Sequence, residues 1–148
     1  MLGSVDFLPG LEQFTVTGGR LNAARAVGVP DLVGPWVAAT DPAGATAGPV
    51  SSLRLTFNEP LDPASFTAAD VTSFTGPGGS IAVTGVSAVA GSHNLKFDIT
   101  FAPQFVKGSY EMRLGPEIFD VAGNPMNQDR DAINGELPDD EYVAELVI

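Results

Sequence analysis

Hydrophobic and polar residues alternate along most of this chain. Between residues 50 and 58, Leu53, Leu55 and Phe57 fall on one side of an extended segment, and polar residues fall on the other. The alternation is strongest between residues 95 and 101. A period of two places successive side chains on opposite faces of a β-strand. The pattern therefore predicts strands that are buried on one face.

Turn-forming clusters of glycine, proline, asparagine and aspartate separate these segments. A bulge is expected at Gly85, and one helical turn over 63–67 should place Phe66 in the core. No long helical pattern interrupts the series, which favours an all-β fold, an antiparallel β-sandwich of about seven strands. The predicted strands cover 36–40, 50–58, 71–75, 81–90, 95–101, 110–114 and 142–148.

The N-terminal part of the chain departs from the strand pattern. After a Gly-Gly turn, apolar residues recur at the spacing of one helix face, at Leu21, Ala24 and Val27. A helix this short needs a surface to pack against. We expect residues 1–33 to be the end of a preceding domain plus a linker, disordered or loosely docked, and the module itself to span 34–148. An alanine-rich helix packed on the β domain is the alternative.

Composition narrows the classes of function. The 148 residues include 7 Lys and Arg against 18 Asp and Glu, a net charge of −11. Nucleic acids and anionic membranes attract basic surfaces, so neither is an expected partner. The chain has no cysteine, which excludes disulfides and thiol chemistry. No apolar run reaches the roughly 20 residues of a membrane span, so membrane insertion is not expected.

The segment from Ser4 to Val27 contains the phrase G-G-R-L-N-A, preceded by S-V-D-F-L-P-G-L. It resembles the end of the catalytic domain of secreted subtilisin-like serine proteases, where this phrase leads into the closing helix. The resemblance implies an upstream protease domain in the same chain. The three catalytic motifs of that family, D-[ST]-G, H-G-T-H and G-T-S-M-A, are absent here. No catalytic residue therefore carries over.

Two further phrases lie in the β region: L-T-F-N-E-P-L-D-P-A-S-F, from Leu55 to Phe66, and D-V-A-G-N-P, from Asp120 to Pro125. With them, the part from Gly48 onward resembles the bacterial Ig-like domains of secreted and cell-surface proteins. The resemblance implies an Ig-like sandwich outside the cell. The segment around Tyr110 also fits a tyrosine corner, in which the hydroxyl bonds to upstream backbone. A plain buried aromatic is the alternative.

The segment 127–140, N-Q-D-R-D-A-I-N-G-E-L-P-D-D, holds the strongest candidate for site chemistry. Its oxygen-bearing side chains stand at alternate positions, and calcium takes about six to eight oxygen ligands. The spacing is not that of an EF-hand. Crowded negative charge is repulsive unless a cation or solvent relieves it, so a structural calcium site is predicted and a solvated acidic loop is the alternative. The candidate ligands are Asn127, Asp129, Asp131, Asn134, Glu136, Asp139 and Asp140.

Other polar and aromatic residues give weaker signals. The segment 58–62 is expected to form a turn in which Asp62 caps the helical turn, with a ligand role as the alternative. His93 and the adjacent Ser92 lie in a polar loop, and no carboxylate is placed to orient the imidazole as in a catalytic dyad. Trp36 is expected to pack the linker onto the domain, although an exposed tryptophan could stack on a sugar.

These observations predict a monomeric, non-catalytic Ig-like accessory module, secreted or at the cell surface. It would act as a spacer, stabiliser or docking unit C-terminal to a subtilisin-like serine endopeptidase. The alternative is an adhesion module that binds a carbohydrate or another surface protein. An enzyme in its own right has only scattered carboxylates in its favour.

Overall fold

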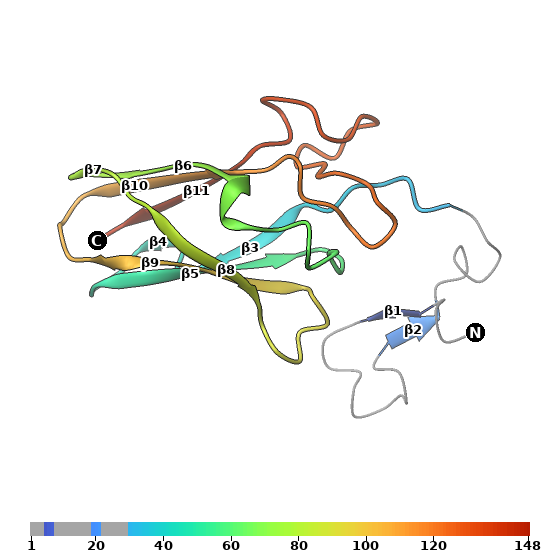
Figure 1. Ribbon diagram of the computed structural model, residues 1–148, viewed down its shortest axis with the longest axis horizontal. Helices are drawn as coiled ribbons and strands as arrows, with labels where there is room; N and C mark the ends of the chain where they lie inside the picture. Colours follow the sequence, from blue (N-terminus) through green and yellow to red (C-terminus); the bar gives the residue numbers. More distant parts are fainter. Residues whose placement is uncertain (1–4, 8–18, 22–29) are drawn as a thin grey trace.

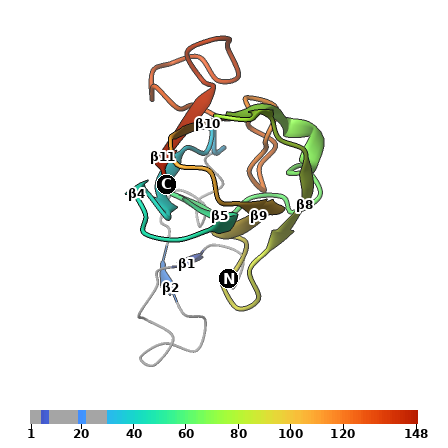
Figure 2. The same ribbon diagram turned by 90° about the vertical axis from the view of Figure 1, so that its left-hand side faces the viewer.

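The computed structural model of this chain describes residues 5–7, 19–21 and 30–148. Within 30–148, two β-sheets pack face to face as a sandwich (Figure 1). Figure 2 shows β10 and β11 in one layer and β5 and β9 in the other. The one helical element among the described residues is the short 3-10 helix η2 (Ala68–Asp70), and no described helix has the length and apolar character needed to cross a membrane.

The first sheet has four antiparallel strands, and their alternation was readable in the sequence. Its register slips between Val83 and Gly85, which confirms the predicted irregularity at that glycine. In spatial order the strands are β3 (Val37–Asp41), β5 (Val50–Phe57), β9 (Lys96–Gln104) and β8 (Val83–Ala88).

The second sheet has five strands, and its edges are very short. The outer strands β4 and β7 have two residues each, too few to show a pattern in the sequence. They raise the strand count of the sandwich from about seven to nine. β4 pairs with β11 in parallel, and the other pairs are antiparallel. The spatial order is β4 (Gly44–Ala45), β11 (Tyr142–Val147), β10 (Ser109–Leu114), β6 (Val71–Gly76) and β7 (Gly79–Ser80).

The core lies between the sheets and is built from the inward-facing positions of the strands. Phe66 is buried as predicted, and its ring centroid lies 5.9 Å from that of Phe57 and 5.4 Å from that of Phe97. Each such side chain stabilises the fold by about 1.5–3 kcal/mol when fully buried. The side chains with no exposed surface include Leu53, Leu55, Leu61, Ile99, Met112, Leu114, Ile118 and Met126.

The tyrosine corner is confirmed. The Tyr110 hydroxyl donates a 2.7 Å hydrogen bond to the carbonyl oxygen of Val106, four residues upstream, while the ring is buried against the core. This bond satisfies the hydroxyl group at the point where the chain turns from β9 into β10.

Two helical predictions need correction. Leu21 lies in strand β2 (Gly19–Leu21), which pairs antiparallel with β1 (Val5–Phe7), so the predicted helix is wrong there. A partner strand supplies ladder hydrogen bonds that a short helix next to two glycines cannot match. Ala24, Val27 and most of the predicted remnant 1–33 lie outside the described residues, and the boundary between 1–33 and 34–148 stays a prediction.

The predicted helical turn over 63–67 is displaced along the chain. Residues 63–65 form a hydrogen-bonded turn, and the 3-10 helix follows at Ala68–Asp70. Thr67 caps it: the threonine side chain accepts from the Ala69 amide, and the Asp70 side chain accepts from the Thr67 amide. This reciprocal capping box fixes the helix start at Ala68, five residues later than the sequence pattern indicated.

Candidate functional site

The chain joins the sandwich through residues 31–37, here called the lead-in segment. Its backbone is irregular before β3, so its N–H and C=O groups need partners outside a sheet. Side-chain amides supply them. Asn124 Nδ2 donates to the carbonyl of Asp31 at 3.1 Å, and Asn134 Nδ2 donates to that of Leu32 at 2.9 Å. Two loops that are far away in the sequence thus hold the start of this segment.

The rest of the lead-in segment is held in the same way. The Trp36 amide donates to Asn58 Oδ1 at 2.7 Å, and the Val37 amide donates to Gln128 Oε1 at 2.9 Å. The backbone N–H of Asn127 donates to the carbonyl of Pro35 at 2.9 Å. We call this set of groups the lead-in clamp: the side chains of Asn58, Asn124, Gln128 and Asn134, with the Asn127 N–H.

Gly34 marks the closest approach within the clamp. Its amide donates to Asn134 Oδ1 at 3.2 Å. A Cβ atom built on Gly34 would lie 1.7 Å from the carbonyl oxygen of Pro125, so no other residue fits without a backbone shift. The lead-in segment therefore lies directly against the turn that contains Pro125. In Figure 1 this segment, in cyan, runs beside the orange and red loops that follow β10.

The D-V-A-G-N-P phrase forms that turn. Asp120 is 1% exposed, and its Oδ1 accepts from the amides of Ala122 and Asn124 at 2.7 and 2.8 Å. Its Oδ2 accepts from Asn124 Nδ2 at 2.8 Å. Gly123 provides the positive φ of 92° that the turn requires. The buried carboxylate thus positions Asn124 for the clamp. Its oxygen also lies within 4.8 Å of carboxylate oxygens of Asp31 and Glu59.

The N-E-P-L-D-P-A-S phrase forms a second turn beside it. Asp62 Oδ1 accepts from the Ala64 amide at 3.0 Å, which agrees with the capping role expected for this aspartate. Ser65 Oγ accepts from the Phe119 amide at 2.9 Å and so ties this turn to the following loop. The same phrase supplies Asn58 to the clamp. Both phrases that carry the family resemblance therefore hold the loops at one end of the sandwich.

The predicted calcium ligands lie in residues 127–140, here called the acidic loop. Asp140 is fully buried, and its two carboxylate oxygens accept from the amides of Gln128 at 2.7 Å and Glu136 at 3.0 Å. This carboxylate closes the base of the loop. Asn134 Oδ1 is also in use, because it accepts from the Gly34 amide and from Asn127 Nδ2. Both residues thus have structural partners within the protein.

Three of the predicted ligands converge. Carboxylate oxygens of Asp129, Asp131 and Glu136 all lie within 4.8 Å of one another, whereas Asp139 is exposed and stands outside that group. Partial desolvation raises the pKa of Glu136 above its usual range, and the negative charges of Asp131, Asp139, Asp129 and Asp140 raise it further. The surroundings of Glu136 thus oppose its ionisation.

Asn127 is another predicted calcium ligand, and its side chain includes a buried oxygen atom without a described partner. The residue is 1% exposed. Its Nδ2 donates to the carbonyl of Asp131 at 3.0 Å and to Asn134 Oδ1 at 2.8 Å. Its Oδ1 is buried and has no hydrogen-bond partner among the residues that the structure describes. Such an atom is rare in folded proteins and calls for an explanation.

Trp36 and Ser92 both contact neighbouring residues of the fold. The Arg130 guanidinium lies over the half-buried Trp36 ring, 5.9 Å from its centroid, which agrees with the expectation that Trp36 packs the linker onto the domain. Ser92 Oγ accepts from the Lys96 amide at 3.3 Å, and His93 adopts a positive φ of 53° as turn residues do. The loop geometry thus explains both Ser92 and His93.

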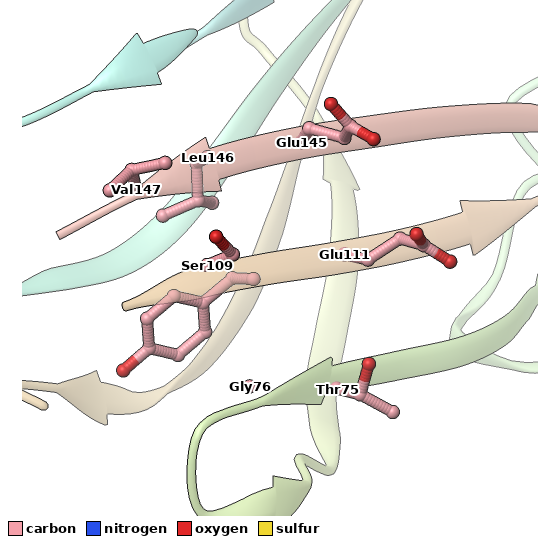
Figure 3. Close-up of a pocket in the computed structure, with 8 residues that line it drawn as sticks. Thr75, Gly76, Ser109, Glu111, Glu145, Leu146 and Val147 are labelled. Atoms are coloured by element: carbon pink, nitrogen blue, oxygen red, sulfur yellow. The ribbon is translucent and has the colours of Figure 1, made fainter. Parts of the chain in front are cut away.

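A shallow pocket of about 200 Å³ lies on the outer face of the five-stranded sheet. Figure 3 shows Glu111 and Glu145 on neighbouring strands, and the two residues are direct register partners. Arg113 Nε donates to Glu111 Oε1 at 2.8 Å. Small-molecule sites are mostly apolar clefts of about 300–1,000 Å³. This small acidic depression does not have those properties.

The comparisons with known proteins agree with the sandwich. A sequence model described as bacterial Ig-like domain matches residues 31–133. No curated protein matches the chain. The crystal structure of the S-layer protein rSbsC(31-844) superposes with a TM-score of 0.53 at 19% identity, over 85% of this chain and 14% of that chain.

The structure of surface layer protein SbsC, domains 1-6, gives the same values. The N-terminal part of the S-layer protein SbsC gives a TM-score of 0.54 at 18% identity, over 84% of this chain and 25% of that chain. This chain thus spans a quarter or less of these proteins, and at such identity the likeness concerns the fold. Because the matched residues 31–133 make up more than half of the sequence, the chain belongs to the bacterial Ig-like domain family.

Proposed function

We propose that this chain is a non-catalytic structural module that fixes the orientation of whatever precedes its sandwich. The lead-in clamp is the observation that carries the proposal. Four side-chain amides from three loops bind the backbone of residues 31–37. Gly34 packs so closely on Pro125 that this segment has little freedom to shift. A flexible tether would need neither feature.

The buried polar groups support a structural role over a catalytic one. The carboxylates of Asp120 and Asp140 both accept backbone N–H bonds, which stabilise turns and loops. Ser92 Oγ accepts from the Lys96 amide within the same loop, as a turn hydroxyl does. Ig-like domains commonly serve as spacers between other domains. A location outside the cell is supported by the likeness to domains of surface-layer proteins.

The upstream partner that we propose is a subtilisin-like protease domain. The phrase G-G-R-L-N-A within Ser4–Val27 is the support for it. The sequence encoded upstream of Met1 tests this directly: the three catalytic motifs of that family should appear there. Further Ig-like repeats in their place would refute the protease link and would assign the module to a surface stalk.

A binding role is the second candidate, and one observation favours it. Phe105 and Val106 are 70% and 57% exposed, beside a surface pocket of about 450 Å³ to which Lys107 and Ile148 contribute. An exposed aromatic next to a pocket suits a glycan or a surface protein. A glycan array should show binding that Phe105→Ala removes. An array without signal would leave the structural role as the better account.

Hydrogen exchange tests the structural role. Asn134→Ala and Asn58→Ala each remove one clamp acceptor, so the amides of Gly34 and Trp36 should exchange faster while those of strand β9 keep their protection. Gln104→Ala is the matched control, because the side-chain amide of Gln104 donates to the nearby Ala102 carbonyl, outside the clamp. Unchanged exchange in the clamp variants would contradict the proposal, and so would measurable turnover of peptide substrates by the purified chain.

A further inference from the structure

We propose that the acidic loop binds one calcium ion through Asp129, Asp131 and Glu136, with Asn127 Oδ1 as a fourth oxygen. The distances support the carboxylate part of this set. Calcium–oxygen bonds are about 2.3–2.6 Å long, so two ligands on opposite sides of the ion lie about 4.6–5.2 Å apart. The carboxylate oxygens of these three residues are all within 4.8 Å of one another. Such separations are those expected of oxygens that share one calcium ion.

Asn127 supplies an independent observation. Its amide nitrogen donates to the carbonyl of Asp131 and to Asn134 Oδ1, so two residues of the acidic loop hold this side chain. Its amide oxygen is buried, and no residue in the described part of the chain donates a hydrogen bond to it. A buried acceptor that loses its water and gains no donor destabilises the fold. A cation in the loop would supply the missing partner, and an amide oxygen is an ordinary calcium ligand.

The charges in the loop point the same way. The carboxylates of Asp129, Asp131 and Glu136 place three negative charges within 4.8 Å of one another, and like charges at such distances repel. Arg130 is the only basic residue between 127 and 140, and its guanidinium lies over Trp36. A divalent cation would relieve this repulsion.

The structure also reduces the predicted ligand set. Asp140 and Asn134 already accept two hydrogen bonds each from the protein, and Asp139 lies outside the converging group. The remaining ligands include two exposed aspartates, which leaves room for water molecules in the coordination shell. Calcium tolerates such an irregular shell, whereas magnesium demands near-octahedral geometry and dehydrates reluctantly.

The same loop carries Gln128 and Asn134, which belong to the lead-in clamp. An ion that fixes residues 127–136 would therefore also stiffen the junction before the sandwich. This coupling rests on the proposed structural role, whereas the ion site itself does not.

Isothermal titration of the metal-free chain with calcium chloride tests the site. We expect one ion per chain, with a Kd on the order of 10⁻⁴–10⁻³ M as in extracellular modules. Asp131→Asn and Glu136→Gln should each weaken binding by about tenfold or more, because each removes a charged ligand. Glu117→Gln makes the same change of charge at an exposed position outside the loop and should leave the Kd unchanged. Asp139→Asn, inside the loop but outside the converging group, should have a smaller effect than Asp131→Asn.

Three results would overturn the site: no saturable calcium binding, equal affinity in the wild type and in Asp131→Asn, or a loss in Asp139→Asn as large as in Asp131→Asn. Equal melting curves of all variants in EDTA would show that they fold. In the wild type, free calcium at about ten times the Kd should raise the Tm by roughly 3–6 °C. Hydrogen exchange at Gly34 then tests the coupling separately. Binding without slower exchange would remove the coupling and leave the ion site standing.

Discussion

Gly34→Ala tests the packing of the lead-in segment most directly, because the added methyl group would overlap the backbone of Pro125. Its Cβ would stand 1.7 Å from the Pro125 carbonyl oxygen and 2.9 Å from its carbon. Close carbon–oxygen contacts in proteins are about 3.3–3.6 Å. The two backbone segments must therefore separate by about 1.6 Å, and both belong to backbone rather than to a flexible side chain.

The cost follows from the bonds that such a movement breaks. Two hydrogen bonds cross the displaced contact. The Gly34 N–H donates to Asn134 Oδ1 at 3.2 Å, and the Asn127 N–H donates to the Pro35 carbonyl at 2.9 Å. Each is worth about 0.5–1.5 kcal/mol net, and overpacking adds about 1–3 kcal/mol. We therefore expect the free energy of unfolding to fall by roughly 2–6 kcal/mol, with a decrease in Tm of at least about 4 °C.

Urea unfolding followed by circular dichroism measures this loss. Gly48→Ala is the matched control, because its Cβ would meet nothing within 4 Å. That variant should remain within about 1 kcal/mol of the wild type. A loss below about 0.5 kcal/mol for Gly34→Ala would show that the lead-in segment does not pack on Pro125 in solution, and the lead-in clamp would lose its main support.

Three further outcomes can be measured on the same chain. Tyr110→Phe removes the bond to the Val106 carbonyl and should lower the free energy of unfolding by about 0.5–1.5 kcal/mol in urea titrations, with an unchanged value arguing against the tyrosine corner. Asp140→Ala leaves two loop amides without their acceptor and should cost about 2–4 kcal/mol, whereas a neutral effect would mean that the loop closes without it. The hydrogen bond from Arg54 lowers the pKa of Asp98 in the folded chain below the ordinary value of 3.8. The ion pair therefore stabilises the fold above pH 3.8, and this contribution is lost as the pH falls through the folded pKa. Asp98→Asn should therefore flatten the acid side of the stability profile, and an identical slope would exclude this ion pair as its cause.

The strands could be predicted from the sequence because their signal is local. Strand β5 from Leu53 to Phe57 and strand β9 from Phe97 to Phe101 have apolar side chains at every second position, and burial follows that pattern. The two-residue strands β4 and β7 carry no such period, so only their partners define them. At Gly19–Leu21 a local pattern was present but predicted the wrong element. A local helical spacing at Leu21 gave way to pairing with Val5–Phe7, which a reading of neighbouring residues does not detect.

Contacts between residues that are distant in the sequence also form most of the candidate site, and these could not be predicted. The run of acids from Asp129 to Glu136 was visible as a pattern, and three of its carboxylates do converge. The clamp was not predicted, because Asn134 binds the Gly34 amide across 100 residues and Gln128 binds Val37 across 91. Their only signal was an abundance of asparagine and glutamine in loops, which turns alone would explain. The burial of Asp140 likewise depends on backbone amides that the fold brings to it.

The short outer strands of the five-stranded sheet have a consequence for neighbouring molecules. A sheet edge exposes unpaired N–H and C=O groups, on which another copy of the chain can add a strand. With two residues each, β4 and β7 offer too few such groups for stable pairing along their own outer sides. A second copy of the chain therefore gains little by adding a strand to β4 or to β7.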